Sequence, residues 1–163
     1  MRWLRHLFAP AAQAAFPPAS LDRIAQAIAD GEKRHSGQVM FAVESDLSLA
    51  LLWQGVNARQ RAEHAFAVLR TWDTQANNGV LIYLLLADHA IEIVADRGLR
   101  AQVDEAQWQR VCEHLRQQLN QSGGEAAVLA AVDEVSDLLA ARFPPDPAGR
   151  SGNELPDRPQ LLG

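Results

Sequence analysis

The chain has 163 residues, of which 48% are hydrophobic and 21% are charged, so it can bury one ordinary core but is short for two domains. Its formal net charge is -5 and its basic residues are scattered, which excludes the basic face of a general nucleic-acid binder. The single cysteine, Cys112, excludes an internal disulfide, and no apolar run approaches the ~20 residues that span a bilayer.

The first eight residues combine two arginines with Trp, Leu and Phe side chains, and Pro10 ends any helix soon after them. A secretory signal is disfavoured, because Arg5 and Pro10 interrupt the apolar segment that such a signal needs. Two alternatives stay open for residues 1–8: a weak membrane-surface anchor, or a tail that packs on its own domain. We expect a cytoplasmic protein, with peripheral membrane contact as the alternative.

The next segments alternate between helical and strand patterns. Ser20 is expected to cap a helix whose apolar residues recur at helical spacing. Residues 39–43 and 80–86 are continuous apolar runs of strand length, which predicts two strands covered on both faces. Asn57 is expected to cap a second helix between them, so the two strands should be parallel and joined by a right-handed crossover.

A short turn after the second strand leads to residues 90–94, whose alternation predicts an antiparallel hairpin. Two amphipathic helices follow, one around Trp108 to Leu119 and one around Val128 to Leu139. The order α-β-α-β-β-α-α predicts an α/β fold: a three-layer α/β/α sandwich, Rossmann-like, with a mixed sheet.

The domain boundaries follow from composition. Residues 1–19 form an N-terminal tail, and residues 20–143 form the folded domain. Residues 144–163 are rich in Pro, Gly, Asp and Arg, which predicts a disordered C-terminal tail.

One apolar segment, residues 47–53, has no clean period and a single polar interruption at Ser48. It is either an edge strand tucked under a helix or an exposed patch for a partner. In the second case the contact residues are Leu49, Leu51, Leu52 and Trp53.

No enzyme motif is present: the chain lacks a nucleophile elbow, a phosphate-binding loop, a dinucleotide-binding loop and a zinc-binding H-E-x-x-H. We interpret His35, His64, His89 and His114 as solvated or capping residues. Cys112 lies in an apolar helical stripe, so we expect it in the core.

Carboxylates and amides collect where the predicted strands begin and end. At the carboxyl edge of the parallel pair, where open α/β sheets usually place ligands, the order groups Glu44 and Asp46 with Asp88.

At the opposite edge Asp73, Asn77, Asn78 and Asp96 can converge, and calcium prefers such oxygen ligands. The alternative is that these are ordinary turn and cap residues.

The residues that suggest a family are short blocks around the strands: Ser36-Gly37, Asn77-Asn78-Gly79-Val80-Leu81, and Ile91-x-Ile93 followed by Gly98-Leu99. They resemble the TPM domain, which occurs in thylakoid-lumen proteins of the photosystem II repair cycle and in many bacterial proteins. The resemblance spans about residues 20–141 and implies a Rossmann-like α/β/α sandwich, with calcium binding and acid phosphatase activity in some members.

The chain departs from the family pattern at two places. Family members often read Asp-Asn-Gly at Asn77-Asn78-Gly79 and Gly-Tyr-Gly-Leu-Glu at Asp96-Arg97-Gly98-Leu99-Arg100. Two carboxylates are thus absent and one, Asp96, is added, so we expect no required cofactor and at most weak calcium binding.

Two functions are compatible with these patterns. We favour a non-catalytic binding module that acts on a protein partner, at a membrane surface in one version. The alternative is a metal-assisted phosphomonoester hydrolase in which Asp73, Asn77, Asn78 and Asp96 hold a cation, and Arg97 or Arg100 neutralises phosphate.

Overall fold

The computed structural model describes residues 1–149 and 152–163. The strands are β1 (Gln38–Glu44), β2 (Gly79–Leu85), β3 (Ala90–Ala95) and β4 (Gln160–Leu162). The longer helices are α3 (Pro18–Glu32), α5 (Ala58–Val68), α7 (Glu105–Ser122) and α8 (Gly124–Arg142). The short helices are α1 (Arg2–Leu7), α2 (Ala12–Ala15), α4 (Leu49–Trp53) and α6 (Arg97–Arg100).

The sheet has the strand order β3-β2-β1-β4. β1 pairs with β2 in parallel, with Phe41 opposite Ile82, and β2 pairs with β3 antiparallel, with Ile82 opposite Ile93. Every residue of β1 and β2 is buried, as their continuous apolar sequences predicted. The parallel crossover and the hairpin are both confirmed.

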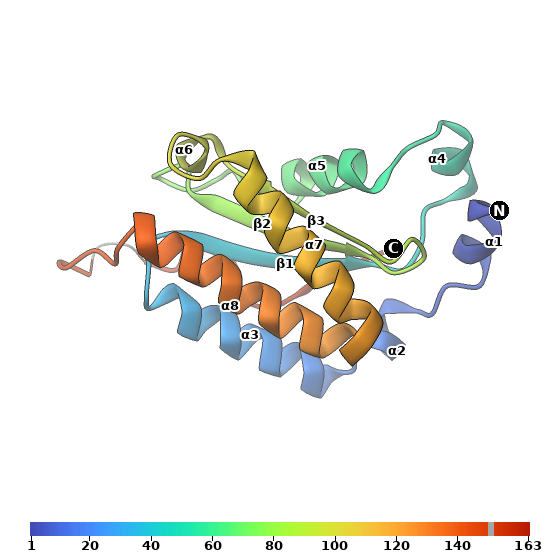
Figure 1. Ribbon diagram of the computed structural model, residues 1–163, viewed down its shortest axis with the longest axis horizontal. Coiled ribbons are helices and arrows are strands. Elements are labelled where there is room, and N and C mark those ends of the chain that lie inside the picture. Colours follow the sequence, from blue (N-terminus) through green and yellow to red (C-terminus); the bar gives the residue numbers. More distant parts are fainter. Residues whose placement is uncertain (150–151) are drawn as a thin grey trace.

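Side chains of β1 alternate between two cores. Val39, Phe41 and Val43 pack with α3, α7 and α8, whereas Met40 and Ala42 pack with α5 on the other face. Figure 1 shows α3 and α8 below the sheet and α5 above it. The three-layer α/β/α sandwich with a mixed sheet is therefore confirmed.

Helix α5 begins as expected from its sequence. The Asn57 side chain accepts the Gln60 backbone N–H at 2.9 Å, and the Gln60 side chain accepts the Asn57 N–H in return. The cap expected at Ser20 is wrong, because α3 already begins at Pro18, whose fixed φ suits a first turn.

The boundary expected at residue 20 is also too late. Phe16 is fully buried, and its ring meets that of Phe41 edge-on with 5.6 Å between centroids. The segment before α3 therefore contributes to the core.

The C-terminal segment differs most from its expected disorder. Gln160–Leu162 forms β4 along the free edge of β1, and Leu155 is buried in the core beside α5. The Gln38 side chain accepts the backbone N–H groups of Glu154 and Leu155 at 2.8 and 3.2 Å. The Pro- and Gly-rich composition of this segment gives no sign of these few contacts, because they form only where the edge of β1 is open.

The edge strand that was one alternative for residues 47–53 is wrong, because residues 49–53 form the short helix α4. Ser48 caps the short helix α4, accepting the Leu51 backbone N–H at 3.4 Å, and β4 takes the sheet edge instead. Within the described residues, no helix has the length and apolarity needed to cross a membrane.

Candidate functional site

Residues from two turns meet at the amino end of β2. The Asp96 backbone N–H donates to the Gly79 carbonyl, and the Gly98 N–H donates to the Asn77 carbonyl, both at 2.9 Å. Arg97 Nε donates to Asn77 Oδ1 at 3.2 Å. The hairpin thus places Asp96 beside the Asn77 turn, which is the juxtaposition expected from the strand order.

Asn78 is fixed in this turn from two sides. Its backbone N–H donates to Thr74 Oγ1 at 3.0 Å, and its Nδ2 donates to the Ser36 carbonyl at 2.6 Å. Asn77 adopts a left-handed φ of 51°, which asparagine tolerates better than most residues. A Cβ at Gly98 would lie 2.5 Å from the Asn77 carbonyl oxygen, so this close approach requires glycine.

Two buried acceptor oxygens of this cluster have no hydrogen-bond partner within the described residues: Asn78 Oδ1 and Asp96 Oδ2. Asp96 uses its other oxygen to cap α6, accepting the Arg97 backbone N–H at 2.7 Å. An unsatisfied buried acceptor costs about 1–3 kcal/mol, so a cation or another donor placed here would be stabilising.

The donor set fits a metal only in part. Asp73 is exposed and pairs with Arg70 at 2.5 Å, so its carboxylate is engaged away from the cluster. In the described part of the chain, no three His, Cys, Asp or Glu side chains are placed to hold a metal ion. Calcium takes six to eight oxygens, so a site on Asn77, Asn78 and Asp96 would depend mainly on water.

The two arginines expected near phosphate lie in different surroundings. Arg97 contacts the cluster through Asn77. Arg100 instead lines a separate hollow of about 380 Å³ together with Arg59 and Trp108.

The carboxylates expected to group at the opposite edge are each engaged separately. Glu44 is buried and accepts hydrogen bonds from Arg61 Nε and Nη2, the shortest at 2.8 and 2.7 Å, and one from Tyr83 at 2.5 Å. Asp46 is exposed, and Asp88 binds the N-terminal helix. The edge that usually binds ligands is therefore filled by internal ion pairs.

Asp88 holds α1 against α4. Arg2 donates to Asp88 Oδ2 at 2.7 Å and to the Val56 carbonyl at 2.8 Å. Because the Leu47 backbone N–H donates to His6 Nδ1 at 2.9 Å, the imidazole proton lies on Nε2, which is 3.1 Å from Asp88 Oδ1. Burial alone would raise the pKa of Asp88, but the hydrogen bonds and charge of Arg2 outweigh it and lower that pKa.

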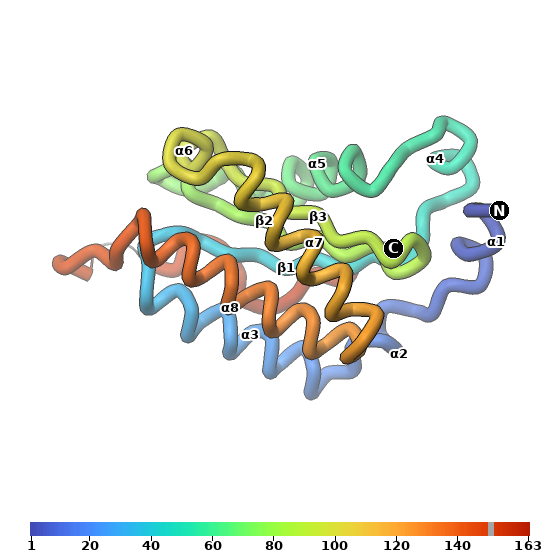
Figure 2. Tube along the Cα trace, viewed as in Figure 1, coloured from blue at the N-terminus to red at the C-terminus, as the bar shows by residue number. Residues whose placement is uncertain are grey.

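Helices α1 and α4 together expose an unusual amount of apolar side chain. Trp53 is 89% exposed, Phe8 78% and Trp3 51%. A groove of about 420 Å³ between the helices is lined by Trp3, Leu49, Leu52 and Trp53, while Leu51 packs partly onto the core below. Figure 2 shows both helices at the same end of the molecule. We call the following set the α1–α4 surface: Met1, Trp3, Leu7, Phe8, Leu49, Leu52 and Trp53.

The sequence drew attention to both segments of this surface but did not predict that they lie side by side. For residues 1–8 the sequence left open a membrane-surface anchor or a tail packed on its own domain, and for residues 47–53 an edge strand or an exposed patch for a partner. Their link is Asp88, which is 86 positions from Arg2 and carries no pattern of its own. His35 was interpreted wrongly as solvated or capping, because it is 2% exposed. Cys112 is buried, as expected.

Comparison with known proteins adds a family and a fold. A family model described as the TPM domain matches residues 12–138. The NMR structure of BA42 protein from the psychrophilic bacterium Bizionia argentinensis superposes with a TM-score of 0.76, at 24% sequence identity, over 88% of this chain and 93% of that one. No curated protein matches the chain.

Proposed function

This chain belongs to the TPM domain family, and we propose on that premise that it is a non-catalytic binding module that engages a protein partner through the α1–α4 surface. The observation that supports this most is the clustering of exposed apolar residues. Of the nine large hydrophobic side chains that are exposed in the described residues, six belong to that surface: Met1, Trp3, Leu7, Phe8, Leu49 and Trp53. Three of these six, Trp3, Leu49 and Trp53, line one groove, and exposed apolar patches mark interaction sites more often than scattered exposed residues do.

The composition of the surface suits a protein partner. Tryptophan is enriched among the few residues that dominate binding energy, and Trp3 and Trp53 both line the groove. The groove is already formed, because the bonds from Arg2 and His6 to Asp88 fix α1 beside α4. A partner side chain therefore enters a preorganised apolar site at low entropic cost.

The test is site-specific photo-crosslinking in cells with p-benzoylphenylalanine in place of Trp53. Trp72 is the matched control, because it is also an exposed tryptophan but lies beyond the end of α5. We expect a discrete protein adduct from position 53, absent from position 72 and lost in the Leu49→Ser background. Equal adducts from both positions would contradict the proposal.

A membrane surface is the alternative occupant of the same residues, since tryptophans and the exposed Arg5 also suit a lipid interface. Co-sedimentation with phosphatidylglycerol vesicles separates the two. Binding to vesicles that is lost in Trp53→Ser, with no protein adduct in cells, would replace the protein partner by a membrane.

A metal-assisted phosphomonoester hydrolase is the second candidate, favoured by Asn78 Oδ1 and Asp96 Oδ2, which lie near Arg97 and have no hydrogen-bond partner in the described part of the chain. A divalent cation held there would polarise phosphate, and Arg97 would neutralise its charge. We expect no turnover of p-nitrophenyl phosphate with calcium or magnesium, because Asp96 would be occupied as the ligand of the cation and the cluster of Asn77, Asn78, Asp96 and Arg97 offers no second carboxylate, histidine or thiol as base or nucleophile. Turnover that is lost in Asp96→Asn, with the fold intact, would establish the enzyme.

A further inference from the structure

The α1–α4 surface carries a protruding side chain and a hollow next to each other. The hollow is the groove of about 420 Å³ that is lined by Trp3, Leu49, Leu52 and Trp53. Trp53 is 89% exposed although it lines this groove, so its indole stands at the rim and extends into solvent. One patch therefore offers both an aromatic side chain to insert and an apolar groove to receive one.

The exposed area of this surface matches what a stable interface needs. Its six exposed side chains are three aromatic and three aliphatic ones. Because an aromatic side chain buries ~150–250 Å², the six together present on the order of 800 Å² of apolar area. An interface of standard size buries about 800 Å² on each partner. Two copies of this surface would thus supply both sides of a standard interface.

The composition of the surface is that of an interface between identical chains. Residues 47–53 contain no ionisable side chain, and residues 1–8 contain only Arg2, Arg5 and His6. Homodimer interfaces are more apolar than those of transient complexes, at about 65% against about 57% non-polar area. A surface built from large apolar side chains with few charges is therefore more typical of a homodimer.

Electrostatics do not oppose contact between two copies at this end of the molecule. Arg2 is neutralised by Asp88, whose Oδ2 lies 2.7 Å from Arg2 Nη2. The exposed charges beside the groove are Arg5 on α1 and Asp46 before α4, which have opposite signs. Two copies that meet here bring no excess of like charge, although the whole chain carries a net charge of -5.

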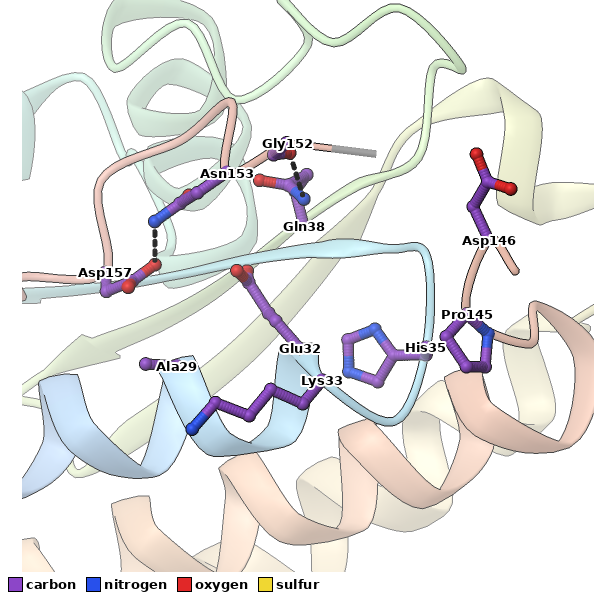
Figure 3. Close-up of a pocket in the computed structure, with 10 residues that line it drawn as sticks. All are labelled: Ala29, Glu32, Lys33, His35, Gln38, Pro145, Asp146, Gly152, Asn153 and Asp157. Carbon is purple, nitrogen blue, oxygen red and sulfur yellow. Dashed lines mark hydrogen bonds between the residues drawn. The ribbon is translucent and has the colours of Figure 1, made fainter. Parts of the chain in front are cut away.

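The excess of negative charge lies at other faces. Figure 3 shows one of them, a polar cavity of about 410 Å³ at the carboxyl end of α3. Its walls include three acidic residues, Glu32, Asp146 and Asp157, and the basic residue Lys33. This end of α3 lies opposite to α1 and α4 in Figure 1. Because a second copy would meet like charge there, self-association is favoured at the α1–α4 end.

Two-fold symmetry would use the protruding side chain and the groove twice. In a two-fold dimer the same patch contacts its own copy, so the patch has to be complementary to itself. Leu49 and Trp53 lie one helical turn apart on α4. An axis that passes beside them places Trp53 of each copy over the groove of the other. Such a contact is complete after two copies and does not lead to filaments.

We propose, resting on the function proposed above, that the partner of the α1–α4 surface is a second copy of this chain. The two copies form a two-fold dimer in which each Trp53 covers the groove of the other. Helix α1 supplies Trp3 to each groove, and Asp88 holds α1 in place through Arg2 and His6. The dimer therefore depends on the docking of α1.

The first experiment is sedimentation equilibrium of the full-length chain from about 1 μM to about 300 μM, a range that covers weak and moderate affinities. We expect reversible association to twice the chain mass of 17.9 kDa. Trp53→Ser should raise the dissociation constant at least about thirtyfold, as expected for a residue that dominates an interface. Trp72→Ser is the matched control and should leave it unchanged, because Trp72 is an exposed tryptophan beyond the end of α5.

The second experiment tests the symmetry with Leu49→Glu and Leu49→Lys, and Leu49 is exposed enough for both to fold. Residues near a two-fold axis lie close to their own copies, so each variant alone should be monomeric because like charges meet. An equal mixture should form a heterodimer, which native mass spectrometry identifies by its mass. A mixture that remains monomeric, while the wild type dimerises, would refute the two-fold contact at α4.

The failure of this inference is distinguishable from the failure of the proposed function. A chain that stays monomeric up to about 300 μM, while position 53 crosslinks a different protein in cells, would exclude the second copy and keep the binding module. A dimer that Trp53→Ser does not weaken would place the interface elsewhere and overturn the inference. Vesicle binding through Trp53, with neither a dimer nor a protein adduct, would overturn both.

Discussion

Replacing Arg61 by methionine should destabilise the fold by about 3–5 kcal/mol, because it leaves the Glu44 carboxylate buried without its counter-ion. Glu44 is 3% exposed, and Arg61 Nε and Nη2 donate to its two oxygens at 2.8 and 2.7 Å. Only the hydrogen bond from Tyr83 would remain in the variant. Burial raises the pKa of Tyr83, so its hydroxyl stays protonated as a donor at every accessible pH.

Three further variants measure the separate contributions of Tyr83, Glu44 and the ion pair to the free energy of unfolding. Tyr83→Phe keeps the ion pair and loses one hydrogen bond to a charged group, which should cost about 1.5–3 kcal/mol. Glu44→Gln should cost less than Arg61→Met, because the Arg61 side chain is 21% exposed and can reach water. The double variant Glu44→Gln, Arg61→Met contains no uncompensated charge, so the two costs should not add, and their coupling should exceed about 2 kcal/mol.

The assay is equilibrium urea unfolding, with thermal unfolding as a second measure. At about 2–4 °C per kcal/mol for a chain of this size, Arg61→Met should lower the unfolding midpoint by about 6–20 °C. Arg116→Met is the control, because Arg116 is exposed and pairs with its helix neighbour Glu113, and it should cost under about 1 kcal/mol. A cost below 1 kcal/mol for Arg61→Met, or additive effects in the double variant, would refute the assignment of a buried, coupled pair.

Three further predictions test other parts of the fold. Glu32→Gln should stabilise the protein at pH 8 by up to about 3 kcal/mol and should have little effect at pH 4. The reason is that the pKa of Glu32 is raised in the folded state, so the stability of the wild type falls as the pH rises from about 4.5 to about 7; urea unfolding at both pH values measures this. Asp88→Asn should release α1, which faster hydrogen exchange of residues 2–7 would show. In the wild type the same release should occur only below about pH 4, because the pKa of the Asp88 carboxyl group is lowered. Gly98→Ala should destabilise by about 1–3 kcal/mol, because its Cβ meets the Asn77 carbonyl oxygen; an unchanged urea midpoint would contradict that contact.

The parts of the fold that were predictable are those with a periodic cause. β1 and β2 are continuous apolar runs because helices cover both faces, and the length of the helical segment between them fixes a parallel crossover. Asn57 and Gln60 form a capping box within four residues, so neighbouring residues determine where α5 begins. Each of these features depends on neighbours that are close in sequence.

The features that were missed depend on contacts between distant segments. β4 is three residues long, and it is a strand because the edge of β1 beside Ala42 is open to it. His35 follows the charged end of α3, and its buried ring lies beside Gly31, where α3 meets Ser136 of α8. Composition measures how much apolar surface a segment carries, not whether a sheet edge is available to receive it.

The pairing of the carboxylates explains why the candidate sites lie where they do. Open α/β sheets usually bind ligands at the carboxyl edge of their parallel strands, but here Glu44 and Asp88 at that edge are already bound to arginines of this chain. Displacing either arginine would leave a largely buried charge, so ligand binding there is costly. The buried acceptors that have no donor among residues 1–149 and 152–163 include Asn78 Oδ1, Asp96 Oδ2 and His35 Nε2, which belong to segments at the amino ends of β1 and β2. Polar ligands should therefore bind at the amino edge of the parallel strands. At the carboxyl edge the ion pair between Arg2 and Asp88 holds α1 in place and so maintains the α1–α4 surface.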